Sequence, residues 1–169
     1  MLKEKEKKER KAMRRKDREI TDREEIRAIL ERARVLHLGI NGEERPYVVA
    51  LHYGLEWKDG LPVFYIHSAR EGRKLELLRR DGRAFVEIDT DEALVSGGEI
   101  PCQYGAAYAS VMCQAQAEIL PEGEEKRRAL QILMKTQTGR DFAITPEMAK
   151  NVAVVRLRAE TLSAKARRV

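Results

Sequence analysis

The sequence has few cysteines, few aromatic residues and no long apolar run. Only two of its 169 residues are cysteine and only 5% are Phe, Trp or Tyr. Cys102 and Cys113 form no C-x-x-C pair and have no histidine at metal-ligand spacing, so we expect two free thiols and no structural zinc site. No apolar segment approaches the roughly 20 residues that span a bilayer, and the charged N-terminus lacks the apolar centre of a signal peptide. We therefore expect a cytoplasmic protein with no membrane association.

The net charge of +5 comes from the first 20 residues. These hold ten Lys or Arg and five Asp or Glu, and subtracting them from the totals of 33 and 28 leaves 23 basic and 23 acidic residues at positions 21–169. Because the remainder is formally neutral, the charge gives little support to nucleic-acid binding, and we expect none. We expect a charged N-terminal extension over residues 1–20 and one domain over residues 21–169.

Apolar periodicity predicts a chain of strands with a few helices. Thr21-Asp22-Arg23-Glu24 fits a capping box and predicts a helix over residues 22–34. Asn41-Gly42 and Asp59-Gly60 are turn signals, which favour an antiparallel meander of the first three strands. The predicted strands are residues 35–40, 47–55, 61–67, 84–89, 104–120 and 152–157. The other predicted helices are residues 71–80 and 122–137, and residues 90–103 are predicted to be a loop.

Six strands joined mostly by tight turns predict an α+β fold built around an antiparallel barrel. A parallel nucleotide-binding sheet is not indicated, because the sequence contains neither G-x-G-x-x-G nor G-x-x-x-x-G-K-S/T.

One stretch predicts an anion site. An apolar strand ends at His67 and Ser68, and Gly72 then precedes Arg73 and Lys74 at the start of a helix. Backbone N–H groups at a helix start, a serine hydroxyl and two cations can converge on one phosphate group. The sequence therefore predicts a phosphorylated cofactor.

The remaining candidate chemistry is thin. We interpret His37 as structural, leave His52 open between a structural role and a site role, and favour His67 for the site because it ends a strand. No nucleophile elbow indicates a hydrolase, and no isolated carboxylate pair indicates a glycosidase. This favours a cofactor that brings its own reactivity.

Several motifs in matching order also resemble a known family. They are residues 46–51, 65–69, 71–74, 101–104 and 108–111. Together they resemble the FMN-binding split-barrel proteins, and more narrowly the pyridoxamine 5'-phosphate oxidase-like branch that includes the nitroimidazole-resistance (Nim-type) flavoproteins. The resemblance runs from about residue 14 to residue 165.

This resemblance implies a six-stranded antiparallel split β-barrel with flanking helices, in a homodimer that binds FMN at the subunit interface. One strand would lie along the isoalloxazine ring, a second would line the ribityl and phosphate groups, and two cations would neutralise the phosphate. A further strand would approach the flavin. The residues implied, in that order, are Val48, Val49, Ala50 and Leu51; Tyr65, Ile66, His67 and Ser68; Arg73 and Lys74; Tyr108 and Ser110.

The chain departs from the family at Ala50, where similar proteins often have proline, and its C-terminal segment has no clear counterpart of the residues that recognise pyridoxal phosphate. We therefore expect an FMN-dependent oxidoreductase that passes hydride or electrons to a small acceptor such as a nitro-aromatic or quinone-like compound, with NAD(P)H as a donor, and not a true pyridoxamine phosphate oxidase. Two alternatives stay open: a flavin-binding or sensor module without turnover, and a haem-binding split barrel with His52 or His67 as axial ligand.

Overall fold

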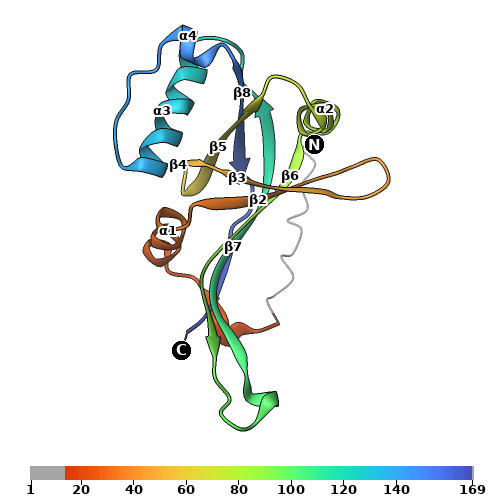
Figure 1. Cartoon of the computed structure of the whole chain (residues 1–169), viewed down its shortest axis with the longest axis vertical. Coiled ribbons are helices and arrows are strands. Elements are labelled where there is room, and N and C mark those ends of the chain that lie inside the picture. Colours follow the sequence, from red (N-terminus) through yellow and green to blue (C-terminus); the bar gives the residue numbers. More distant parts are fainter. Residues whose placement is uncertain (1–13, 169) are drawn as a thin grey trace, which may run out of the picture.

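A computed structural model describes residues 14–168 of the chain (Figure 1). Residues 1–13 of the predicted N-terminal extension lie outside the described residues. Within the rest of the extension, Glu19 and Ile20 pair with Lys165 and Ala164 near the other end of the chain. The sheet therefore includes the last two residues of the extension.

The described residues form nine strands in one antiparallel sheet. Its main path has the order β3-β2-β6-β7-β8-β5-β4, while β9 pairs with β1 and β7. No pairing joins β3 to β4 within residues 14–168, so the sheet does not close on itself. The strands are β1 (Glu19–Ile20), β2 (Val35–Ile40), β3 (Tyr47–His52), β4 (Gly54–Lys58), β5 (Leu61–Ala69), β6 (Arg83–Val95), β7 (Gly105–Ile119), β8 (Val152–Ala159) and β9 (Ser163–Arg167).

This architecture confirms the predicted α+β split-barrel class but corrects the strand list. The structure has nine strands where six were predicted, because β1 and β9 were missed and the predicted strand 47–55 is two strands. It breaks at Tyr53, which is fully buried and donates a hydrogen bond to the carbonyl of Leu30. The predicted three-stranded meander is also wrong: β2 pairs with β3, whereas β5 pairs with β4 and β8.

Within residues 14–168 four α-helices flank the sheet, and Figure 1 shows their arrangement. They are α1 (Arg23–Arg32), α2 (Arg73–Arg80), α3 (Glu124–Thr138) and α4 (Pro146–Ala149), and the 3-10 turns are η1 (Lys16–Arg18) and η2 (Pro101–Gln103). Asp22 caps α1 by accepting a hydrogen bond from the N–H of Glu24, one residue later than the capping-box start at Thr21 suggested. The short helix α4, with Thr145 as its cap, was not predicted.

The helix α3 packs closely on the sheet at β4. A Cβ atom added at Gly54 would lie 2.5 Å from the backbone nitrogen of Leu133, which is far inside van der Waals contact. Only glycine lets the two backbones approach this closely. The main core lies between the sheet and α1 and α2, and a smaller core lies under α3 and α4.

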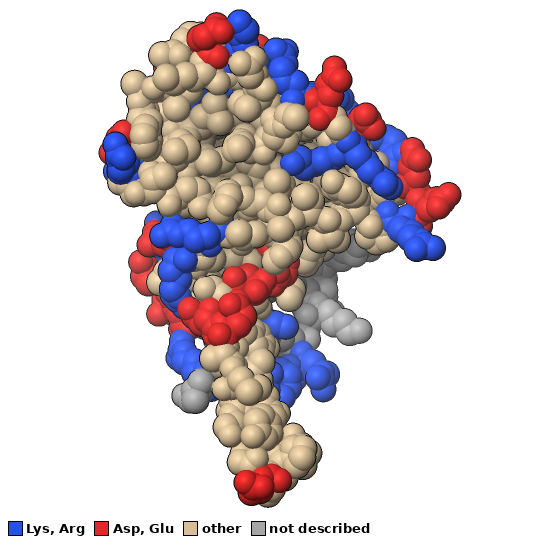
Figure 2. Space-filling model, viewed as in Figure 1, with Lys and Arg blue, Asp and Glu red and all other residues tan. Residues whose placement is uncertain are grey.

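The predicted loop over residues 90–103 is wrong in its first part, because β6 continues to Val95 and pairs with β7 up to Gly105, whereas residues 96–100 lie in a loop. The alternation of apolar residues is interrupted by a register shift between Thr90 and Ala93, and Asp91 there has a φ of 62°. The result is a long hairpin that projects from the body (Figures 1 and 2). The end of the hairpin has little charge, because Glu99 is the only Asp, Glu, Lys or Arg among residues 93–105.

No helix among the described residues is long and apolar enough to cross a membrane.

Candidate functional site

The predicted anion site lies where β5 ends and α2 begins. Gly72 stands at the N-cap of α2 with a φ of 133°, a conformation that favours glycine. No side chain caps the helix, so the N–H groups of its first turn have no side-chain acceptor. These groups and the positive end of the helix dipole favour a negatively charged ligand.

Three basic side chains belong to this region, and we call them the α2 cluster: His67, Arg73 and Lys74. The pKa of His67 is lowered, mainly by burial and further by the nearby charges of Lys74 and His52. Burial lowers the pKa of Lys74, and no carboxylate of residues 14–168 opposes that effect. Among the described residues the part-buried Lys74 therefore has no carboxylate partner, and a bound anion would stabilise the charged forms of Lys74 and of the more exposed His67.

The strand β3 lies beside the α2 cluster. The guanidinium of Arg73 stacks over the ring of Tyr47, 5.5 Å from its centroid, and so connects α2 to the start of β3. Along β3 the side chains of Val48 and Ala50 are exposed, whereas Val49 and Leu51 pack partly against the core. Val48 is 63% exposed. Val48 and Ala50 lie on the opposite face of β3 from Tyr47, the residue that Arg73 contacts, and they form an exposed apolar strip there.

Because side chains alternate along β5, its predicted site residues point to both faces of the sheet. Ile66 is fully buried in the main core, and Tyr65 is buried on the other face, where its hydroxyl donates a hydrogen bond to Glu56. The hydroxyl of Ser68 donates to the carbonyl of Ala69 at 2.9 Å. Only His67 and Ser68 of this group have side chains at the end of the strand that meets α2.

The two predicted residues of β7 lie elsewhere in the sheet. Strands β2 and β6 separate β7 from β3, and Tyr108 and Ser110 pair with Arg167 and Lys165 of β9. With strands about 4.8 Å apart, three strand spacings amount to about 14 Å. Within one chain Tyr108 and Ser110 are therefore well separated from β3, although β7 also contacts α2.

Another hollow of the described residues has none of the α2 cluster in its wall. It measures about 520 Å³ and lies between β2, β6 and β7, with Gly39, Phe85 and Gln114 in its wall. Its basic residue, Arg83, forms an ion pair with Asp81 at 2.8 Å. The hollow therefore offers an apolar surface but no unneutralised cation for a phosphate.

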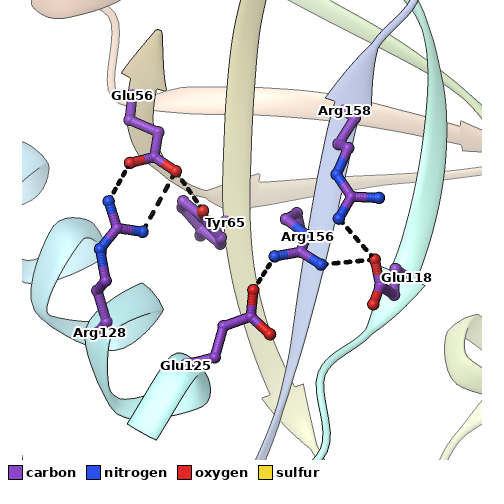
Figure 3. A network of polar contacts seen from close by, with 7 residues as sticks. All are labelled: Glu56, Tyr65, Glu118, Glu125, Arg128, Arg156 and Arg158. Atoms are coloured by element: carbon purple, nitrogen blue, oxygen red, sulfur yellow. Dashed lines mark hydrogen bonds and ion pairs between the residues drawn. The ribbon is translucent and has the colours of Figure 1, made fainter. Parts of the chain in front are cut away.

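A second group of charged residues lies under α3, and we call it the α3 network (Figure 3). Its members are Glu56, Tyr65, Glu118, Glu125, Arg128, Arg156 and Arg158. Arg128 donates to both oxygens of Glu56, at 3.3 and 2.5 Å, and Arg156 bridges Glu118, at 2.7 Å, and Glu125. Arg158 also pairs with Glu118, at 3.1 Å.

In the α3 network every guanidinium has a carboxylate partner. Burial on its own would raise the pKa of Glu56, but hydrogen bonds from Arg128 and Tyr65 outweigh it and the pKa of Glu56 is lowered. Although the network borders a hollow of about 340 Å³, its positive charges are already compensated. It therefore serves to hold α3 on the sheet.

Neither cysteine is paired, as expected. Cys113 is buried in the main core, and burial raises the pKa of its thiol to about 12, so it is unreactive at neutral pH. Cys102 is exposed in η2, at the end of the projecting hairpin.

The open antiparallel sheet with helices at its ends defines the chain as a split-barrel protein of the α+β class. The sequence profile of the pyridoxamine 5'-phosphate oxidase family matches residues 22–166. The chain therefore belongs to the pyridoxamine 5'-phosphate oxidase-like family.

Solved structures agree with this assignment. A candidate 5-nitroimidazole antibiotic resistance protein from Bacteroides thetaiotaomicron is 30% identical, with a TM-score of 0.74 over 88% of this chain and 86% of that one. Two others share the fold. The flavocytochrome Anf3 from Azotobacter vinelandii is 20% identical, with a TM-score of 0.75 over 94% of this chain and 73% of that one. A FAD- and haem-binding protein from Mycobacterium smegmatis is 17% identical, with a TM-score of 0.75 over 90% of this chain and 74% of that one. No curated protein sequence matches the chain.

Proposed function

We propose that this protein binds FMN and uses it as an oxidoreductase that passes hydride or electrons to a small acceptor such as a nitro-aromatic or quinone-like compound. The observation that carries the proposal is the α2 cluster, in which the part-buried Lys74 and the more exposed His67 have lowered pKa values beside a helix start without a side-chain cap. A phosphate monoester supplies the negative charge that this region lacks. Family membership makes a flavin phosphate the natural candidate.

The residues present fit such a cofactor. Lys74, Arg73 and the first N–H groups of α2 would hold the phosphate, with His67 and Ser68 beside it. The exposed apolar side chains of Val48 and Ala50 on β3 would offer a surface for the flat ring. A bound flavin supplies the redox chemistry, while the protein orients the ring, excludes water from one face and sets the polarity around it. NAD(P)H is the donor we propose.

We further propose a homodimer with FMN at the subunit interface. Tyr108 and Ser110 lie three strands from β3 in the same chain, so a second subunit is needed to bring them to one flavin. Two apolar side chains on the outer face of the sheet, Val48 and Phe85, are 63% and 43% exposed in the single chain. An exposed apolar surface of this kind is typical of a subunit interface.

The decisive experiment is an absorbance spectrum of the purified protein before and after denaturation, with mass spectrometry of the released compound. Flavin absorbance and a released mass equal to that of FMN support the proposal. A Soret band would favour a haem protein with His52 or His67 as ligand, and a released mass equal to that of FAD would reject FMN. A colourless protein that takes up no added FMN would reject flavin binding altogether.

Turnover is a separate measurement. We expect NADH or NADPH to reduce the bound flavin and a nitro-aromatic or quinone acceptor to reoxidise it. If the protein binds FMN but is not reduced by either nicotinamide and shows no turnover, it is a binding or sensor module. Size-exclusion chromatography with light scattering tests the dimer, and an FMN-loaded monomer would reject the interface site.

A further inference from the structure

Three potential metal ligands meet on the outer face of the sheet, one strand in from β3. His37 on β2 pairs directly with Glu87 on β6, and Asp89 follows two residues later on the same side of β6. The neighbouring residues Leu36 and Ile88 point the other way, into the core. The sequence alone gave no reason to group these three residues, because strand pairing brings them together across 50 positions.

The distances suit a metal centre. The Nδ1 atom of His37 lies 3.2 Å from a carboxylate oxygen of Glu87 and 3.4 Å from one of Asp89, and all three ligand atoms lie within 4.8 Å of one another. With metal–ligand bonds of about 2.0 to 2.2 Å, neighbouring ligand atoms of a tetrahedral ion are about 3.3 to 3.6 Å apart. The three atoms therefore need to move little to share one ion.

A fourth polar group lies beside this set. Ser110 on β7 pairs directly with Asp89, so the two side chains are on the same face with Cβ atoms about 4.5 to 5.5 Å apart. Ser110 is only 4% exposed, and within residues 14–168 its hydroxyl has no hydrogen-bond partner. Buried hydroxyl groups rarely lack a partner in folded proteins. A metal-bound water or the ion itself would provide one.

We propose that His37, Glu87 and Asp89 bind a divalent transition-metal ion, with Ser110 as a further ligand or as a partner of a metal-bound water. One imidazole nitrogen and two carboxylate oxygens favour Zn²⁺, Fe²⁺ or Mn²⁺ over Mg²⁺ or Ca²⁺, which prefer ligand sets made only of oxygen. His37 and Glu87 are partly exposed, so an ion has access from solvent and its other coordination positions can hold water. His37 pairs directly with Ala50 of β3, so the metal site lies on the same outer face of the sheet as the surface proposed for the flavin ring.

Isothermal titration of the full-length, chelator-treated protein with ZnCl₂ tests this site. We expect one Zn²⁺ per chain, and at least about tenfold weaker binding in His37→Ala and in Glu87→Gln, since each removes a direct ligand. Ser110→Ala should weaken binding less. The matched control is Asp141→Asn, which removes an exposed carboxylate paired with Lys135 at 2.6 Å and should leave Zn²⁺ affinity unchanged.

Electron paramagnetic resonance of Mn²⁺ added to the unmodified protein is a second readout that needs no variant to fold. Loss of the free Mn²⁺ signal at one equivalent per chain, reversed by added Zn²⁺, supports the site. The proposal is overturned if neither ion binds the unmodified protein, or if His37→Ala, shown to be folded by circular dichroism, binds Zn²⁺ as tightly as the unmodified chain.

Discussion

The α2 cluster and the α3 network both contain basic side chains, yet they differ in charge balance. In the α3 network Arg128, Arg156 and Arg158 each form an ion pair with a carboxylate, so their positive charges are compensated within the protein. In the α2 cluster Lys74 is half-buried with no carboxylate to raise its lowered pKa. A protein gains stability from the first arrangement and loses some through the second. The arginines of the α3 network are therefore structural, whereas the basic residues of the α2 cluster are candidates for ligand binding.

The largest expected effect is the loss of FMN from a variant of the α2 cluster. A hydrogen bond to a charged group contributes about 1.5 to 3 kcal/mol, so Arg73→Ala with Lys74→Ala should weaken FMN binding at least about 100-fold. Folding stability should change little, because Arg73 is exposed and Lys74 has no carboxylate partner within residues 14–168. Fluorescence titration with FMN and urea denaturation measure the two quantities.

The matched control for this pair is Arg79→Ala with Arg80→Ala, which removes the same charge from the last turn of the same helix. FMN affinity should then stay within about threefold of the unmodified value, since exposed charges farther away are largely screened. Equal losses in the two double variants would mean that net charge, and not the α2 cluster, controls binding.

The reverse effect is expected in the α3 network. Arg156 is 11% exposed and bridges Glu118 and Glu125, so Arg156→Met should lower the free energy of unfolding by about 1 to 3 kcal/mol. FMN affinity should be unchanged. Arg158→Met, on a half-exposed side chain, should cost no more than about 1 kcal/mol. If Arg156→Met releases FMN without loss of stability, the division between the two regions is wrong.

A smaller effect concerns the pH dependence of stability. The pKa of Glu56 is lowered in the folded protein, so its contribution is present above the ordinary pKa of a glutamate and is lost as pH falls through the lowered value. Glu56→Gln should therefore be less stable by about 1 kcal/mol at pH 7, with the difference shrinking below about pH 4. Urea denaturation across this range measures the difference, and a constant difference would contradict the assignment.

The smallest expected effect is at His67. Its pKa is lowered in the free protein, so the folded state loses stability as pH falls below the ordinary histidine value, where the unfolded state takes up the proton first. A bound phosphate would favour the protonated ring. The FMN affinity of the unmodified protein relative to His67→Asn should therefore rise a few-fold between about pH 7.5 and pH 6. A ratio that stays flat would remove His67 from the phosphate site.

Local signals in the sequence predicted much of this fold. The turn dipeptides and the apolar alternation located β2, β5, β8 and the three long helices to within a few residues. The two-residue strand β1 was missed because it is a strand only through its pairing with β9, and the weakly apolar β9 was missed because its pairing with β7 and β1 leaves no local signal. The polar residues at the register shift near Asp91 concealed the second half of β6.

The candidate sites also differ in how far the sequence alone could predict them. The α2 cluster was predictable because His67, Arg73 and Lys74 lie within eight positions, on a strand end and a helix start. The α3 network and the His37–Glu87 pair were not, since they join residues up to 72 positions apart through strand and helix packing. A single sequence contains no local signal for such contacts. Nor could it show that Tyr108 lies three strands from β3.

The most direct test of the account compares FMN with riboflavin, which has the same ring but no phosphate. Flavin-free protein should bind FMN at least about 100-fold more tightly than riboflavin, since the phosphate contacts are charge-assisted. This ratio should fall toward one in the Arg73→Ala, Lys74→Ala variant and persist in Arg156→Met. Equal affinity of the unmodified protein for the two flavins would contradict the claim that the α2 cluster is a flavin phosphate site.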